Sequence, residues 1–180
     1  MKNVIRGAVV GLAVMVSAQA AQAQGISVGL GGGVVVPTGD LADGSSTGWS
    51  GTAQLRVKPP VSPLGLQVDA FYTRFGLEGD GHSRMLGGTA NAVFAFPGVS
   101  AARPYLIGGV GLYNAKASVA GAESQTKFGL NAGAGFDFGL GKVNLFAEGR
   151  FHAILKAVPG ATIGEEKPGY MIPLTVGVRF

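Results

Sequence analysis

The 180-residue sequence contains no cysteine, and charged residues make up only 13 % of it. A disulfide-stapled fold is therefore excluded. A disordered chain is excluded as well, because disorder requires low hydrophobicity and high net charge, whereas the mean hydropathy here is positive. The sequence also lacks a basic cluster with interleaved aromatic residues, so we expect no nucleic-acid partner.

A long apolar run is missing too, since the apolar stretch near the amino terminus covers only residues 7–18. A membrane-spanning helix needs about 20 such residues. This stretch follows the positive residues Lys2 and Arg6 and precedes the small-x-small triplet Ala21-Gln22-Ala23. The pattern predicts a secretory signal peptide over residues 1–23, with cleavage after Ala23 or alternatively after Ala20, and one mature domain over residues 24–180. Without the signal the net charge falls from +4 to +2.

Glycine, by contrast, is abundant, with 32 residues or about 18 % of the chain, against a usual value of about 7 %. It has no period of three, which excludes collagen. The mature chain instead alternates with a period of two. Residues 127–138 are the clearest example, with Phe128, Leu130 and Phe136 on one face and glycines on the other. This period is typical of β-strands, and we find no convincing amphipathic helix.

Eight segments alternate in this way and are predicted strands. One of them, residues 105–114, stays ambiguous, because Leu106, Val110 and Leu112 compete with Tyr105, Ile107 and Tyr113 for the outward face. The eight predicted strands cover residues 26–36, 49–58, 66–73, 86–96, 105–114, 127–138, 143–152 and 170–180.

The connections between these segments alternate in length. Long gaps at 38–48, 75–83, 116–126 and 155–169 alternate with short gaps at 59–65, 97–103 and 139–142. Transmembrane barrels have short periplasmic turns and longer outer loops. With both termini on the inner side, aromatic residues gather near both membrane edges, as amphipathic rings prefer. They are Trp49, Tyr72, Phe128, Phe151 and Tyr170 near the outer edge and Phe94, Phe96, Phe136, Phe138 and Phe180 near the inner edge.

The predicted fold is therefore all-β: an eight-stranded antiparallel up-and-down transmembrane β-barrel. A soluble barrel would carry its charged residues outside and a large apolar cup inside. Here the polar faces hold small residues and a few charges, which suits the narrow lumen of an eight-stranded barrel. We expect these charges to form a lumen network of ion pairs or, alternatively, a gate whose pairs exchange partners. The six residues are Arg56, Asp69, Asp137, Glu148, Arg150 and Arg179.

The carboxyl-terminal segment alternates up to the last residue, through Tyr170, Ile172, Leu174, Val176, Val178 and Phe180. This pattern is similar to the strand signal that the outer-membrane barrel-assembly machinery reads. Together with residues 103–111 and 131–138, it makes the mature chain resemble the small OmpA/OmpX-like outer-membrane β-barrel family. The resemblance implies a bacterial outer-membrane location, contact with outer-membrane lipids, delivery by periplasmic chaperones and a monomeric state. Pro173 departs from the pattern, because it removes a ladder donor inside the last strand.

The sequence favours a non-enzymatic structural or surface role in the cell envelope. A narrow channel for ions or small solutes and loop-mediated adhesion stay as alternatives. A lipid-cleaving rim enzyme is disfavoured, because His152 has no serine on its own strand to activate. No nucleotide fingerprint and no spaced set of metal ligands is present, so we expect no cofactor and no metal.

Overall fold

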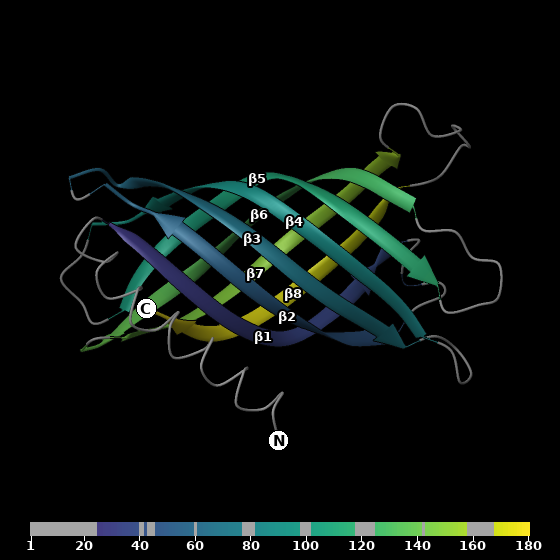
Figure 1. Cartoon of the computed structure of the whole chain (residues 1–180), viewed down its shortest axis with the longest axis horizontal. Coiled ribbons are helices and arrows are strands. Elements are labelled where there is room, and N and C mark those ends of the chain that lie inside the picture. The colour runs from purple at the N-terminus through teal and green to yellow at the C-terminus, as the bar shows by residue number, and fades with distance from the viewer. Residues whose placement is uncertain are drawn as a thin grey trace, which may run out of the picture.

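The computed structural model describes residues 25–39, 42, 46–59, 61–76, 82–97, 102–117, 125–141, 143–157 and 168–180. The predicted signal peptide lies outside these residues. Eight antiparallel strands follow one another in chain order and close into a barrel, which confirms the predicted fold class (Figure 1). They are β1 (Ile26–Thr38), β2 (Ser46–Val57), β3 (Leu64–Gly76), β4 (His82–Ala95), β5 (Ala102–Ala117), β6 (Gln125–Leu140), β7 (Val143–Ala157) and β8 (Gly169–Arg179).

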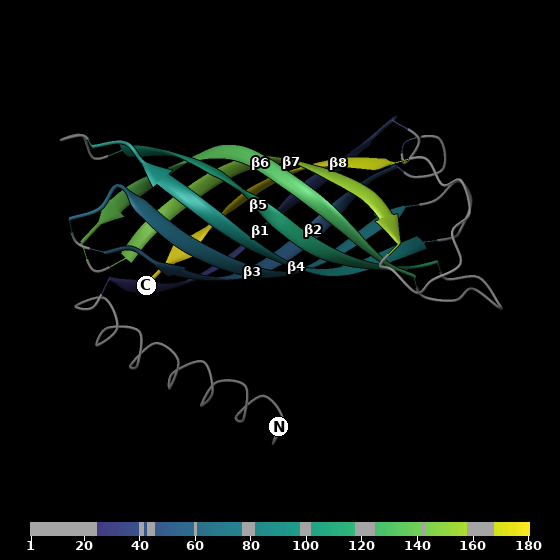
Figure 2. The same cartoon turned by 90° about the horizontal axis from the view of Figure 1, so that it is seen from above.

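The barrel closes where the first strand pairs with the last. β1 lies antiparallel to β8, with Leu30 opposite Val178 and Thr38 opposite Tyr170. Closure leaves no free sheet edge, so the strand backbones satisfy one another's hydrogen bonds, as lipid requires. The start of β1 and the carboxyl end of β8 lie at the same end of the barrel, here called the inner end (Figures 1 and 2). The opposite end is the outer end.

The apolar faces of the strands point away from the barrel axis. Leu66 is 67 % exposed and Val176 is 64 % exposed, and every strand carries exposed apolar side chains. A soluble protein rarely exposes so much contiguous apolar surface. The surface therefore fits the hydrocarbon of a bilayer.

The facing of β5, which the sequence left open, is now settled. Leu106, Val110 and Leu112 point outward and are about half exposed, whereas Tyr105 and Tyr113 point into the barrel and are each 1 % exposed. Each inward tyrosine has a polar partner in the lumen. A buried tyrosine usually requires such a partner.

Aromatic residues pair on the outer surface of the barrel near both ends. Near the outer end, the ring centroids of Trp49 and Tyr72 lie 5.6 Å apart, and those of Phe151 and Tyr170 lie 5.4 Å apart. Near the inner end, Phe94 pairs with Phe96 and Phe136 with Phe138. Two such belts mark the two interfaces of a membrane.

The predicted strict alternation of long and short connections is wrong. The outer connection at 77–81 is shorter than its neighbours at 58–63 and 96–101. The strands run further toward the outer end than their alternating patterns indicated, and β3 and β4 stay paired as far as Gly76 and His82. The longest connection, 158–168, is outer, and the shortest, 141–142, is inner. Within the described residues, no helical segment is long and apolar enough to cross a membrane.

Candidate functional site: the lumen

The inward side chains fill the lumen in layers. Near the outer end lies a buried apolar cluster, here called the outer plug, of Val35, Phe71, Phe75, Met85, Tyr113, Ile154 and Met171. A polar network occupies the middle. The inner end holds a smaller apolar group of Val93, Tyr105 and Ile107 and an open cavity. The layers follow from alternation, because every second residue of each strand must point inward.

Arg150 of β7 is the centre of the polar network. Its Nη1 donates to Asp69 Oδ2 of β3 at 2.7 Å, and its Nε donates to Glu148 Oε1 at 2.7 Å. All three side chains are at least 93 % buried. The ion pairs thus tie β3 to β7 across the lumen, where charges shielded from water must be paired.

The network closes into a ring through β5 and β2. Tyr105 donates its hydroxyl hydrogen to Glu148 Oε2 at 2.8 Å. The guanidinium of Arg56 lies over the Tyr105 ring, with Cζ 4.3 Å from the centroid, and its Nε donates to Gln67 Oε1 at 2.6 Å. Gln67 Nε2 then donates to Asp69 Oδ1 at 2.7 Å, which completes the circuit.

Asp137 of β6 anchors the network at the inner end. Arg56 Nη1 donates to its Oδ2 at 2.9 Å, and Arg179 Nη1 donates to its Oδ1. Arg179 also donates to Gln54 Oε1 at 2.8 Å and lies over the Phe146 ring. One carboxylate is thus shared between two guanidiniums, and the three arginines of the network balance its three acids.

Neutral polar residues extend the network along the barrel wall. Asn91 Nδ2 donates to Asp69 Oδ2 at 2.7 Å, and Asn131 Nδ2 donates to Asn91 Oδ1 at 2.8 Å. Thr89 donates to the same oxygen of Asp69 at 2.9 Å. With Arg150, three donors converge on this one oxygen, an arrangement that fixes the carboxylate in place.

His152 lies between the polar network and the outer plug. Its Nδ1 is 2.8 Å from the hydroxyl oxygen of Tyr113, and its ring contacts Phe71 and Tyr113 edge-on. Ser50 of β2 lines the same small cavity as His152, a relation that the strand-by-strand sequence argument missed. The cavity has a volume of about 30 Å³, far below the roughly 300–1,000 Å³ of typical ligand sites. The Ser50 hydroxyl donates instead to the carbonyl oxygen of Tyr72.

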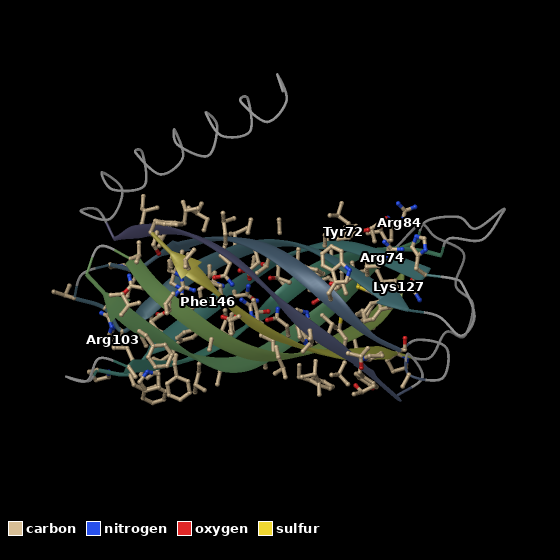
Figure 3. The ribbon with its side chains drawn as sticks, turned by 90° about the horizontal axis from the view of Figure 1, so that it is seen from below. Tyr72, Arg74, Arg84, Arg103, Lys127 and Phe146 are labelled. Carbon is tan, nitrogen blue, oxygen red and sulfur yellow. The ribbon has the colours of Figure 1, made fainter. Side chains whose placement is uncertain are left out.

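The inner end of the lumen opens into a cavity of about 220 Å³. Its charged lining residues come from four strands and the residue after β2, and Arg103 lies at this end, away from Arg74, Arg84 and Lys127 (Figure 3). The charged residues of its lining are Arg56, Lys58, Arg103, Asp137 and Arg179.

The structure brings together all six lumen charges named from the sequence, on β2, β3, β6, β7 and β8. Tyr105, Gln67 and Asn91 complete the ring and its extension, although none of them is among the lumen residues predicted from the sequence. Gln67 and Asn91 sit at inward positions of alternating strands, so the period could have indicated them. Tyr105 could not be placed while the facing of β5 was open. The six residues of the carboxyl-terminal pattern lie on the outward face of β8 and at its end. Their role in assembly stays a prediction.

Within the described residues, no group of three or more histidine, cysteine, aspartate or glutamate side chains could hold a metal ion.

A closed antiparallel barrel of eight strands, with an apolar outer wall, two aromatic belts and a charged lumen, defines a bacterial outer-membrane barrel. The chain belongs to the outer membrane protein beta-barrel domain family, which matches residues 7–180. The resemblance found in the sequence and the outer-membrane location are thereby confirmed. No protein of curated function matches the sequence.

Solved structures share the fold. Neisserial surface protein A is 24 % identical with a TM-score of 0.70, covering 86 % of this chain and 96 % of that one. A major outer membrane protein from Thermus thermophilus is 12 % identical with a TM-score of 0.59, covering 86 % and 97 %. The outer membrane protein OprG from Pseudomonas aeruginosa is 14 % identical with a TM-score of 0.56, covering 87 % and 97 %. These identities show the fold alone.

Proposed function

We propose that this protein is a non-enzymatic structural and surface barrel of the cell envelope whose lumen is closed. It contacts outer-membrane lipids through its apolar wall, acts as a monomer, and reaches the membrane through periplasmic chaperones and the barrel-assembly machinery. The observation that carries the proposal is the filled lumen. The ring of Arg150, Asp69, Glu148, Tyr105 and Arg56 spans the lumen, and the outer plug fills the lumen between this ring and the outer end.

The proposal of a closed lumen follows from packing and charge. The plug residues Phe75, Tyr113 and Met171 are each 1 % exposed, so the outer plug leaves them almost no contact with water. An ion passing through would have to separate Arg150 from its two carboxylates. Breaking a buried pair leaves an uncompensated charge and costs about 3–5 kcal/mol.

The non-enzymatic part of the proposal rests on the surroundings of His152. Acyl transfer needs a nucleophile within hydrogen-bond reach of its base and room for a substrate. Among the described residues the hydrogen-bond partner of His152 is the Tyr113 hydroxyl, and the adjacent cavity of about 30 Å³ is far smaller than the roughly 300–1,000 Å³ of typical ligand sites.

The test is single-channel conductance of the refolded protein in a planar bilayer, after folding has been verified by the gel shift on heating. We expect a folded barrel that shows no discrete conductance steps. The matched variant Phe71→Ala removes an aromatic ring from the outer plug and should raise leakage if the plug seals the lumen. Discrete steps from the unaltered protein would overturn the closed-lumen proposal.

A narrow channel is the second candidate, favoured by the continuity of the polar network from Arg179 at the inner end to Arg150 in the middle. In that case Glu148→Gln, which keeps the side-chain shape and removes one charge, should change the conductance and its ion preference. The adhesion alternative depends on the outer connections, and most of their residues lie outside the described part of the chain.

A further inference from the structure

The cavity at the inner end has the size of a small-ligand site. Its volume of about 220 Å³ lies below the roughly 300–1,000 Å³ typical of sites for drug-sized molecules. It is large enough for several waters or a small ion. The cavity opens at the end where β1 begins and β8 ends, and so toward the periplasm.

The charges around this cavity are unbalanced. Four cationic side chains line it, Arg56, Lys58, Arg103 and Arg179, against the single carboxylate of Asp137. Because Arg56 and Arg179 are balanced within the lumen network as a whole, the excess positive charge is that of Lys58 and Arg103. The terminal carboxylate of Phe180 lies at the same end, but Phe180 is not among the lining residues. A concave site lined by one sign of charge with low-dielectric walls concentrates ions of the opposite sign.

Asp137 is bonded to the two arginines at the base of the cavity and not to the cations at the rim. Arg56 binds one of its carboxylate oxygens and Arg179 binds the other. Arg103 lies opposite Asp137 in the register of β5 and β6. Arg103 nevertheless donates to the neutral Asn144 Oδ1, at a distance of 3.4 Å. Its charge is therefore left without an ionic partner among the described residues.

Two donors in the cavity lining lack acceptors. Arg56 Nη2 and Arg179 Nε are buried and make no hydrogen bond within the described residues. Their side chains are 7 % and 4 % exposed. A buried donor without an acceptor is costly, and a buried charged one more so. An oxyanion in the cavity would place negative charge beside these two buried guanidinium groups.

We propose that the inner cavity is a binding site for a small phosphate-type oxyanion, held by Lys58 and Arg103 at the rim and by Arg56 and Arg179 at the base. Guanidinium groups suit this ligand, because their forked donors match the oxygens of phosphate. The site goes beyond the proposed structural role, since a barrel can bind an anion at one end whether or not its lumen conducts. Arg56 and Arg179 keep their network bonds and contribute their positive charge at the base of the site.

The experiment is calorimetric titration of inorganic phosphate into the refolded full mature protein in phosphate-free micelles. We expect saturable binding with one phosphate per barrel that weakens as salt rises. The double variant Lys58→Gln, Arg103→Gln should raise the dissociation constant about tenfold, as the loss of two partly exposed charge contacts implies. Neither Lys58 nor Arg103 belongs to the ring of lumen residues, so the double variant should fold and keep the gel shift on heating.

The matched control is the double variant Arg74→Gln, Arg84→Gln, which removes the same charge at the outer end and should leave phosphate binding unchanged. Adding phosphatidylglycerol to the micelles separates two sources of the phosphate group. Competition with free phosphate assigns the site to a lipid headgroup, and no competition assigns it to a soluble ion. No saturable binding, or equal weakening in both double variants, would overturn the proposal.

Discussion

Some side chains of the lumen can take their positions only because the residue beside them on the next strand is a glycine. Gly135 of β6 lies under the ring of Tyr105, and a Cβ atom there would come within 2.5 Å of Tyr105 Cζ and Oη. The hydroxyl of Tyr105 donates to Glu148, and the Arg56 guanidinium lies over its ring. Glycine at this inward position is thus what allows Tyr105 to reach the network.

We therefore expect Gly135→Ala to destabilise the barrel by about 1–3 kcal/mol, the usual cost of overpacking. The measurement is the urea midpoint of the refolded protein in lipid vesicles. Gly51→Ala is the matched control, because a Cβ at Gly51 meets nothing within 4 Å. Equal midpoints for the two variants would show that Tyr105 moves aside without loss.

At the scale of the strands, alternation alone predicted eight elements and the facing of seven. It failed for β5, because both faces of that strand carry large apolar or aromatic residues, and only the partners Glu148 and His152 in the lumen decide which face turns inward. It also misjudged where the strands end toward the outside, because pairing with a neighbour extends a strand beyond its alternating residues.

Pro173 interrupts the pairing of β8 with β7. The recorded β7–β8 pairs run as far as Gly149 opposite Leu174 and resume only at His152 opposite Met171. A proline has no N–H to donate, so the ladder is interrupted where Pro173 would face β7. On the other side, Pro173 stays in register with Val35 of β1.

Pro173→Thr should therefore stabilise the barrel by about 0.5–1.5 kcal/mol, the net value of one added hydrogen bond. Threonine is β-branched and suits a strand. Hydrogen exchange of the new amide at position 173 and the urea midpoint would report the change together. A protected amide with a lower midpoint would mean that lost proline packing outweighs the bond gained.

At the scale of the whole molecule, the barrel reverses the usual distribution of polarity. Apolar side chains cover its outside, and its charges are concentrated in the lumen. This arrangement is stable only where the outside meets lipid, and the two aromatic belts set the depth at which it sits. The pairing of Trp49 with Tyr72 places the single tryptophan of the chain in the outer belt.

Trp49, which is 53 % exposed on the outer wall, is accordingly a depth probe. In vesicles of brominated lipid, its fluorescence should be quenched more by bromine near the headgroup end of the acyl chain than by bromine near the chain end. The urea-unfolded protein should show neither effect. Quenching that is strongest at the chain end would contradict the placement of the belt at the interface.

The sequence by itself determined the class of fold, the strand number, most of the facing and the membrane location, because these depend on a period of two and on composition. Only the tertiary structure decided the partners within the lumen. Arg56 meets Asp137 and Arg150 meets Asp69, each across 81 residues of sequence. Such pairs depend on the stagger of the strands in the closed barrel, which brings distant inward positions to the same height. Local alternation states that a side chain points inward, but not which side chain it will meet there.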